Sequence, residues 1–184
     1  MKKNTVNNKL YNTTIDIGAN LLVRACWYVT NVLFFKNPLN PLSALKVFLL
    51  RLFRAHIGTG VVIKPGVNIK YPWKLTIGNY TWIGEDVWID NLSRVIIGNS
   101  VTISQGALLL TGSHDHTSQS FDFISNPITL EDGAWVGAKA TVFGGVTMKS
   151  HSILGIASVA EKDLEPYLIY KGNPAIPIIE RIIK

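Results

Sequence analysis

Aliphatic residues recur at every sixth position through the middle of the chain. Fourteen positions follow this rule, and all of them are apolar in a chain that is 47% hydrophobic. The intervals that end at Ile77 and Ile97 are eight residues long, and an interval of 21 residues separates Leu109 from Leu130. The repeat positions are Ile57, Ile63, Ile69, Ile77, Ile83, Ile89, Ile97, Ile103, Leu109, Leu130, Val136, Val142, Met148 and Leu154.

Two further columns of residues support the same period. Glycine directly follows six of the fourteen repeat positions, and the residue four places after each position is small or β-branched except at Trp73. A period of six fits neither an amphipathic helix nor a long strand. It fits short strands joined by tight corners, with three strands to each triangular coil and the coils stacked in parallel. The longer intervals follow every third strand, so we expect them at one corner; an ordinary sandwich of short strands is the alternative.

The two ends of the chain lie outside the repeat. Residues 21–35 and 43–53 predict two short helices separated by the prolines of NPLNP, with Ser43 as the N-cap of the second. We expect residues 1–56 to form a helical cap over the open first coil, although basic amphipathic helices also bind membrane surfaces. Residues 57–160 form the predicted β-helix with a loop insertion at about 112–129, and residues 161–184 form a tail that ends in a short helix.

Composition narrows the class of partner and the compartment. The net charge of +6 favours anionic partners, but the basic residues are scattered and no nucleic-acid motif is present, so we expect no nucleic-acid binding. The single cysteine, Cys26, excludes an internal disulfide and fits a reducing cytoplasm. No apolar run reaches the roughly 18 residues typical of a membrane-spanning helix. We therefore expect a cytoplasmic protein, with peripheral contact at the inner membrane face left open.

Several segments resemble the hexapeptide-repeat acyltransferases: IGEDVWI (83–89), IGNSVTI (97–103), LEDGAWVGAKATVFGGVTM (130–148) and KGNPA (171–175). Residues 51–91 and 103–115 are similar to the colanic-acid type of O-acetyltransferase in exopolysaccharide biosynthesis. This resemblance covers about residues 20–182. It implies an all-β fold, a left-handed parallel β-helix, and transfer of an acetyl group from acetyl-CoA to a sugar hydroxyl.

Histidine is the residue type best suited to remove the hydroxyl proton in such a reaction at neutral pH. The chain has four histidines, and two of them, His114 and His116, lie in the long interruption of the repeat. His56 precedes the first coil and is expected to be structural, and His151 falls in a repeat unit and is expected to be exposed. A long excursion from so regular a coil favours a functional role. The residues leave His114 and His116 open, and the resemblance implies His114.

The resemblance also implies where the donor binds. In the similar enzymes acetyl-CoA lies along a groove between subunits of a homotrimer, held mainly by backbone groups. Matched motif positions imply Trp135, Ala138, Ile156 and Lys162 as cofactor-binding residues, with Lys162 near the phosphates. The family usually has a basic residue directly after GNPA, where this chain has Ile176. Whether Arg181 replaces that contact stays open.

Acceptor binding is expected on the side of the groove that carries the histidine. Asp90 and Asn91 directly follow Ile89, at the start of the second eight-residue interval, and we expect them one coil below His114. An Asp-Asn pair also favours a turn by itself. Asp115 is a candidate to orient the imidazole, and an exposed acid is the alternative. These three residues are our candidates for substrate binding.

Two other functions remain open on the residues alone. The same fold carries a metal hydrase that uses three histidines, and His114, His116 and His151 match that number. A scaffold without catalysis would keep the coil only. The resemblance favours an acetyl-CoA-dependent O-acetyltransferase that acts on a sugar or glycan acceptor by direct transfer in a ternary complex. We expect no metal in this chemistry.

Overall fold

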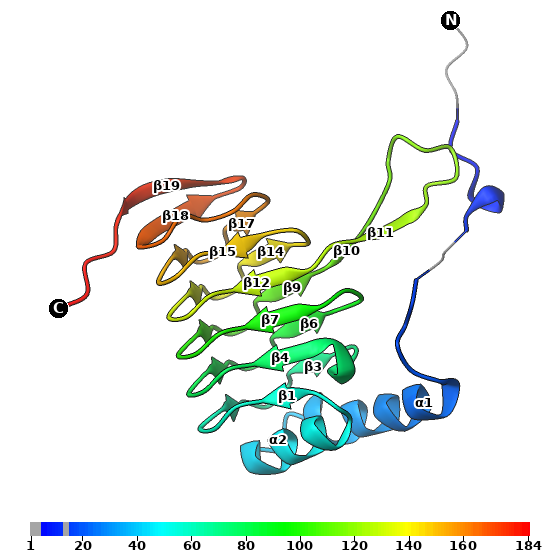
Figure 1. Ribbon diagram of the computed structural model, residues 1–184, viewed down its shortest axis with the longest axis horizontal. Helices are drawn as coiled ribbons and strands as arrows, with labels where there is room; N and C mark the ends of the chain where they lie inside the picture. Colours follow the sequence, from blue (N-terminus) through cyan, green and yellow to red (C-terminus); the bar gives the residue numbers. More distant parts are fainter. Residues whose placement is uncertain (1–4, 13–14) are drawn as a thin grey trace, which may run out of the picture.

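The computed structural model describes residues 5–12 and 15–184, and it shows a triangular β-helix with helices at one end (Figure 1). In the described part of the chain, fifteen short strands wind into five coils of three strands each. Face A contains β1 (His56–Ile57), β4 (Leu75–Ile77), β7 (Val95–Ile97), β12 (Ile128–Leu130) and β15 (Thr147–Met148). Face B contains β2 (Val62–Ile63), β5 (Trp82–Ile83), β8 (Thr102–Ile103), β13 (Trp135–Val136) and β16 (Ile153–Leu154), and continues into β18 (Leu168–Gly172) and β19 (Ala175–Glu180). Face C contains β3 (Asn68–Ile69), β6 (Trp88–Asp90), β9 (Leu108–Leu110), β14 (Thr141–Phe143) and β17 (Val159–Ala160).

The register of the strands confirms the six-residue period. Residues one coil apart are paired in parallel, so that Ile63 aligns with Ile83 and Ile83 aligns with Ile103 along face B. These three side chains are fully buried, and the other repeat positions pack beside them in one continuous core. Buried small residues such as Ala134 fill the remaining space between the layers of aliphatic side chains.

The three long intervals of the repeat fall at a single corner, as the spacing predicted. This corner lies between face C and face A, and we call it corner C–A. It carries residues 70–74 with the short 3-10 helix η3 (Pro72–Lys74), then residues 90–94 one coil further along. The 21-residue interval produces residues 111–127, here named the arm, where β10 (Gly112–His114) and β11 (Phe123–Ser125) pair in antiparallel fashion. Figure 1 shows the arm extending away from the coil.

The predicted N-terminal helices are present, and they cover the first coil. The chain forms a short 3-10 helix η1 (Asn8–Leu10), then α1 (Leu21–Thr30) continued by the π-helical turn η2 (Asn31–Phe35), then α2 (Ser43–Leu52). In the structure α2 packs against β1 and β2, and η2 packs against β3, all three being strands of the first coil. None of the described helices is long and apolar enough to cross a membrane.

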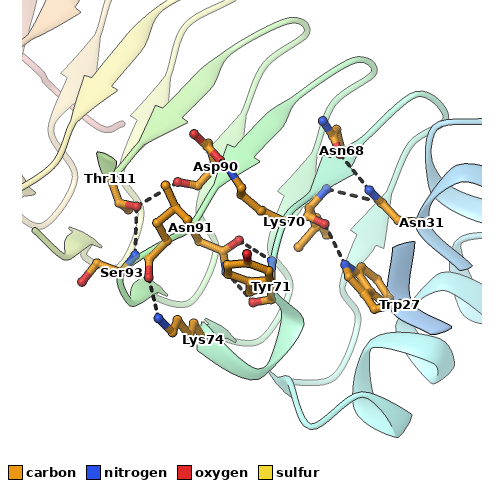
Figure 2. Close-up of polar contacts among 12 residues, drawn as sticks. Trp27, Asn31, Asn68, Lys70, Tyr71, Lys74, Asp90, Asn91, Ser93 and Thr111 are labelled. Atoms are coloured by element: carbon orange, nitrogen blue, oxygen red, sulfur yellow. Dashed lines mark hydrogen bonds and ion pairs between the residues drawn. The ribbon is translucent and has the colours of Figure 1, made fainter. Parts of the chain in front are cut away.

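Side chains from these helices satisfy backbone groups that the first coil leaves without a neighbouring strand. The Trp27 indole N–H donates to the carbonyl of Ile69 at 2.9 Å, as Figure 2 shows. Buried Lys46 donates to the carbonyl of Lys64 at 2.8 Å, and burial lowers the pKa of its ammonium group. The helices therefore replace a missing coil with polar as well as apolar contacts.

Ser43 performs a different task from the predicted N-cap. Leu42 occupies the N-cap position of α2 and makes no side-chain capping bond. The Ser43 hydroxyl instead accepts a hydrogen bond from the backbone N–H of Ile63 at 2.9 Å. The prediction was wrong because an edge strand without a partner competes for the same hydroxyl.

The predicted C-terminal helix was also wrong. Residues 168–180 form the hairpin β18–β19, and β18 pairs in parallel with β16 so that it extends face B. Gly172, with φ at +104°, provides the turn, and Tyr170 is buried against the last coil. The isoleucine-rich strand β19 has β-branched side chains and pairs with β18, while the open edge of the last coil supplies β16 as the partner of β18. Pairing with this edge therefore outweighs the helical pattern.

A close approach between the backbones of two neighbouring coils provides a test of the stacking. A Cβ atom added to Gly78 would lie 2.6 Å from backbone atoms of Gly98, whereas one added to Gly145 would meet no atom closer than 3.6 Å. We expect Gly78→Ala to lower the free energy of unfolding by about 3 kcal/mol through overpacking. Gly145→Ala, which carries only the cost of its positive φ, should lose about 1 kcal/mol. Urea denaturation of both variants measures the difference, and equal losses would contradict a steric origin.

Candidate functional site

His114 is the last residue of β10 and lies on the arm. Its Nδ1 atom lies 2.9 Å from the backbone carbonyl oxygen of Phe121. The imidazole stacks on the Phe121 ring at 4.5 Å between centroids, and the Phe123 ring meets it edge-on at 5.6 Å. Two aromatic rings and one backbone carbonyl therefore fix the orientation of the imidazole.

The contact with Phe121 determines which nitrogen is free. A carbonyl oxygen can only accept a hydrogen bond, so Nδ1 must carry the proton in this contact. In the neutral ring, Nε2 then holds the lone pair that can accept a proton. Phe121 itself has φ at +50°, an uncommon conformation for a non-glycine residue. This bend belongs to the geometry that presents its carbonyl to His114.

Thr111 anchors the base of the arm. The side chain is buried, and its hydroxyl donates to the carbonyl of Asp90 at 2.8 Å while accepting from the backbone N–H of Ser93 at 3.0 Å (Figure 2). Both partners belong to the coil below. The arm therefore begins from a position that the preceding corner fixes through hydrogen bonds to its backbone.

Asp90 and Asn91, predicted to bind the acceptor, both lie at corner C–A one coil below the arm. The carboxylate of Asp90 is almost buried and forms an ion pair with Lys70 at 2.8 Å. Asn91 is fully buried, and its side-chain amide bonds the backbone N–H and carbonyl of Tyr71 at 2.9 and 2.6 Å (Figure 2). This geometry argues against a role of Asn91 in acceptor binding, because its amide is already satisfied and inaccessible. The turn interpretation accounts for Asn91.

Asp115 does not contact the imidazole through its carboxylate. The carboxylate accepts hydrogen bonds from the hydroxyl and the backbone N–H of Thr117 at 2.6 and 2.9 Å, and these bonds lower its pKa. The partner that orients His114 is thus the Phe121 carbonyl, which the sequence did not indicate. His116 is exposed beside Asp115 in the turn of the arm.

Three of the four predicted cofactor-binding residues lie on face B or at the corner that follows it. Trp135 and Ile156 line a cavity of about 420 Å³, and the carbonyl of Ala138 accepts from Ala157 beside it. The cavity is mostly apolar, and Lys171 lies at its edge. The Trp135 indole N–H donates to the Ser104 hydroxyl at 2.9 Å, which holds the half-exposed ring in place.

Lys162 and Arg181 lie elsewhere. Lys162 is exposed at corner C–A after β17, and it does not line the cavity on face B. The Arg181 guanidinium donates to the carbonyls of Gly133 and His151 at 2.8 and 3.0 Å. These bonds hold it against the coil, so the structure gives no sign that Arg181 replaces the basic residue expected at position 176.

The structure does not bring His114 and the face B cavity together within one chain. The arm leaves the coil at corner C–A, whereas the cavity is lined by residues of β13, β16 and β18 and of the corner that follows β16. The predicted base therefore lies on a different side of the triangular coil from Trp135, Ala138 and Ile156, whereas Lys162 lies at the corner that carries the arm.

The N-terminal segment contacts the arm, which sequence analysis missed. Residues 5–12 and 15–20, here named the strap, run from the tip of the arm towards α1 (Figure 1). The Asn7 N–H donates to the Gln119 carbonyl at 2.8 Å, and the Tyr11 ring lies 6.0 Å from the imidazole of His114. Trp73 of η3 donates to the Ile17 carbonyl at 2.6 Å. A polar stretch without periodicity gave no signal for these contacts.

His151 is half-buried in the last coil, where its ring stacks on Tyr167 at 4.8 Å and Nδ1 lies 2.7 Å from the Ser150 hydroxyl. The predicted exposure is therefore only partial. Across residues 5–12 and 15–184, no group of three His, Cys, Asp or Glu side chains is arranged to hold a metal ion.

Comparison with known proteins places this geometry in a family. The chain is 40% identical over 165 residues to the colanic acid biosynthesis acetyltransferase WcaF of Escherichia coli. This match covers 90% of this chain and 91% of WcaF. It is 27% identical over 135 residues to the galactoside O-acetyltransferase of Escherichia coli, covering 72% of this chain and 66% of that protein. No protein-family model matches the chain.

A solved structure shares the fold. The hexapeptide-repeat acetyltransferase VCA0836 of Vibrio cholerae, in complex with acetyl-CoA, superposes with a TM-score of 0.79 at 22% identity, covering 90% of this chain and 92% of that one. The parallel β-helix is the fold of that acetyltransferase, and the identity to WcaF extends over 90% of this chain. The chain therefore belongs to the hexapeptide-repeat acetyltransferases of the WcaF type.

Proposed function

We propose that this chain transfers the acetyl group of acetyl-CoA to a sugar hydroxyl in exopolysaccharide or related glycan biosynthesis, with His114 as the general base. The observation that carries this proposal is the bond from Nδ1 to the Phe121 carbonyl, since it leaves Nε2 able to accept a proton. The identity to WcaF supports the glycan as the class of acceptor.

The reaction uses the free lone pair of Nε2 in His114. Nε2 of His114 accepts the hydroxyl proton while the acceptor oxygen attacks the carbonyl carbon of the thioester, forming the new C–O bond. The C–S bond then breaks, and the imidazolium returns its proton to the leaving sulfur. The Phe121 carbonyl keeps Nδ1 protonated throughout, so His114 ends in the tautomer in which it began. The step uses no residue outside the arm as acid or base.

The cavity on face B suits the donor. Its apolar lining and the half-exposed indole of Trp135 match the uncharged pantetheine chain of coenzyme A, and Lys171 in the lining provides positive charge for the phosphates. Ala138 and Ile156 offer backbone groups at the neighbouring corner. We infer that acetyl-CoA binds along this face.

A homotrimer would complete the site. Because the arm and the cavity on face B lie on different sides of one chain, the cavity of a neighbouring copy has to meet the arm. Three copies arranged in a ring repeat one contact, between the arm of one copy and face B of the next, and close without leaving an open interface. Asp90 and Asp115 would then border the acceptor beside His114.

A direct test compares His114→Ala with His116→Ala. We expect His114→Ala to lower kcat for thiol release from acetyl-CoA by roughly 10²–10⁴, because the general base is lost. Binding of coenzyme A, measured by calorimetry, should be unchanged. His116→Ala, which removes an exposed imidazole from the same arm, should keep most of the activity. The opposite ranking of the two variants would assign the base to His116.

A second test addresses the groove and the trimer together. Trp135→Ala should raise KM for acetyl-CoA about tenfold through lost apolar contact, while Trp88→Ala, which removes an exposed tryptophan from face C, should not. Coexpression of the His114→Ala chain with the Trp135→Ala chain should restore part of the activity at low acetyl-CoA concentration. Such mixed trimers contain interfaces with both residues intact. Absence of recovery in isolated mixed trimers would contradict a site shared between copies.

We further propose that the protein works in the cytoplasm with its N-terminal helices against the inner face of the membrane. Leu22, Val29 and Leu33 follow one side of α1 and η2, and all three are more than half exposed. Exposed apolar side chains on a basic protein favour adsorption to an anionic bilayer.

Vesicle sedimentation tests the membrane proposal. A triple variant with serine at 22, 29 and 33 should lose at least tenfold in affinity for vesicles that contain phosphatidylglycerol, because less apolar surface inserts. The control variant carries serine in place of Ile182 and Ile183, which are also exposed but lie at the other end of the coil. Equal binding by both variants and the natural chain would exclude these helices as the contact.

A further inference from the structure

The residues added to the repeat at corner C–A line a second cavity, which is open to solvent. Its volume is about 790 Å³, and its walls come from α2's C-terminal loop, both eight-residue intervals, the arm and the strap. Trp73 and Phe123 form the apolar part of the wall. The corners of a regular hexapeptide coil are too short to form such walls, so the longer intervals at this corner create the cavity.

The cavity is strongly basic. Arg54, Lys74 and Arg94 line it together with His56, and Asp16 is the acidic residue among the lining positions. In the described part of the chain the ion pairs are Lys70 with Asp90 and Lys149 with Glu165. None of these three cations forms an ion pair within 4 Å among the described residues, and the Asp16 carboxylate is near enough only to raise the pKa of Lys74 in part.

The positive charge of Lys74 is partly desolvated in the cavity, which disfavours its charged form. Its ammonium group donates to the carbonyls of Asp16 and Leu92, the latter at 2.6 Å, and partial burial lowers its pKa. Neutral carbonyls stabilise an ammonium group less than an anion does. A ligand with a negative charge would meet an environment that is already arranged for it.

The cavity lies beside the proposed base. Phe123 contributes to its wall and also contacts the imidazole of His114 edge-on at 5.6 Å. A sugar that fills the cavity would therefore extend past one shared aromatic ring to the base. The Phe123 ring therefore lies between the basic side chains of the cavity and the imidazole of His114.

We propose that this cavity binds the acceptor through an anionic group, a phosphate or a carboxylate, held by Arg54 and Arg94 while a hydroxyl of the same sugar faces His114. The inference rests on the proposed acetyl transfer and adds the chemical class of its substrate. Planar guanidinium groups bind phosphate and carboxylate through paired hydrogen bonds, which favours both anions over a neutral sugar.

The test compares matched acceptors. Glucose, glucose 1-phosphate, UDP-glucose and glucuronic acid are each assayed for thiol release from acetyl-CoA with the full-length protein. The double variant Arg54→Gln/Arg94→Gln, which removes two exposed charges, is compared with Lys36→Gln, which removes an exposed charge on the far helix. Calorimetric binding of glucose 1-phosphate and glucuronic acid, without acetyl-CoA, is measured on the same proteins.

We expect the anionic acceptors to have a kcat/KM at least tenfold above glucose, and the double variant to lose this advantage with KM for acetyl-CoA unchanged. Preference for glucose 1-phosphate and UDP-glucose would identify phosphate, and preference for glucuronic acid would identify carboxylate. Equal use of glucose, or anion binding that the double variant retains, would overturn the inference while leaving acetyl transfer intact. Thiol release with none of the acceptors, together with anion binding that depends on Arg54 and Arg94, would overturn the proposed function and retain the anion site.

Discussion

The pairing of each coil with its neighbours is the constraint on which the rest of this structure depends. Strands of two or three residues cannot satisfy their own backbone, so every N–H and carbonyl on the three faces needs the coil above or below. The stack must therefore end in something other than a coil. At one end the helices place Trp27, Ser43 and Lys46 on the backbone of the first coil, and at the other end the β18–β19 hairpin covers face B.

The same constraint explains why function gathers at one corner. The faces cannot gain or lose a residue without breaking the register of the stack, since a shift by one residue would turn a buried aliphatic outward. A corner can be lengthened without disturbing the pairing on either side. Corner C–A is lengthened in three successive coils, and it holds the arm, His114 and the basic cavity. The remaining corners keep the regular spacing.

Much of this architecture could be predicted from the sequence because it depends on a short, strict period. The buried column through Ile63, Ile83 and Ile103 and the position of the arm both follow from spacing. The Phe121 carbonyl could not be predicted, because any residue has a carbonyl and only the backbone bend at position 121 directs it to His114. The burial of Asn91 could not be predicted, because an asparagine at a corner has the same sequence signal whether its amide bonds the backbone or faces a ligand. The isoleucine-rich tail was misjudged because its partner strand lies outside its own segment.

The strap has a consequence for how the molecule assembles. Neighbouring coils pair residues about twenty positions apart, so the stack is able to form progressively along the chain. The bond from Asn12 to Asp122 spans 110 positions, and it cannot form until the arm has been made and folded. Residues 5–12 of the strap are therefore among the last to find their place. The order of folding thus delays completion of the surroundings of His114 until most of the coil exists.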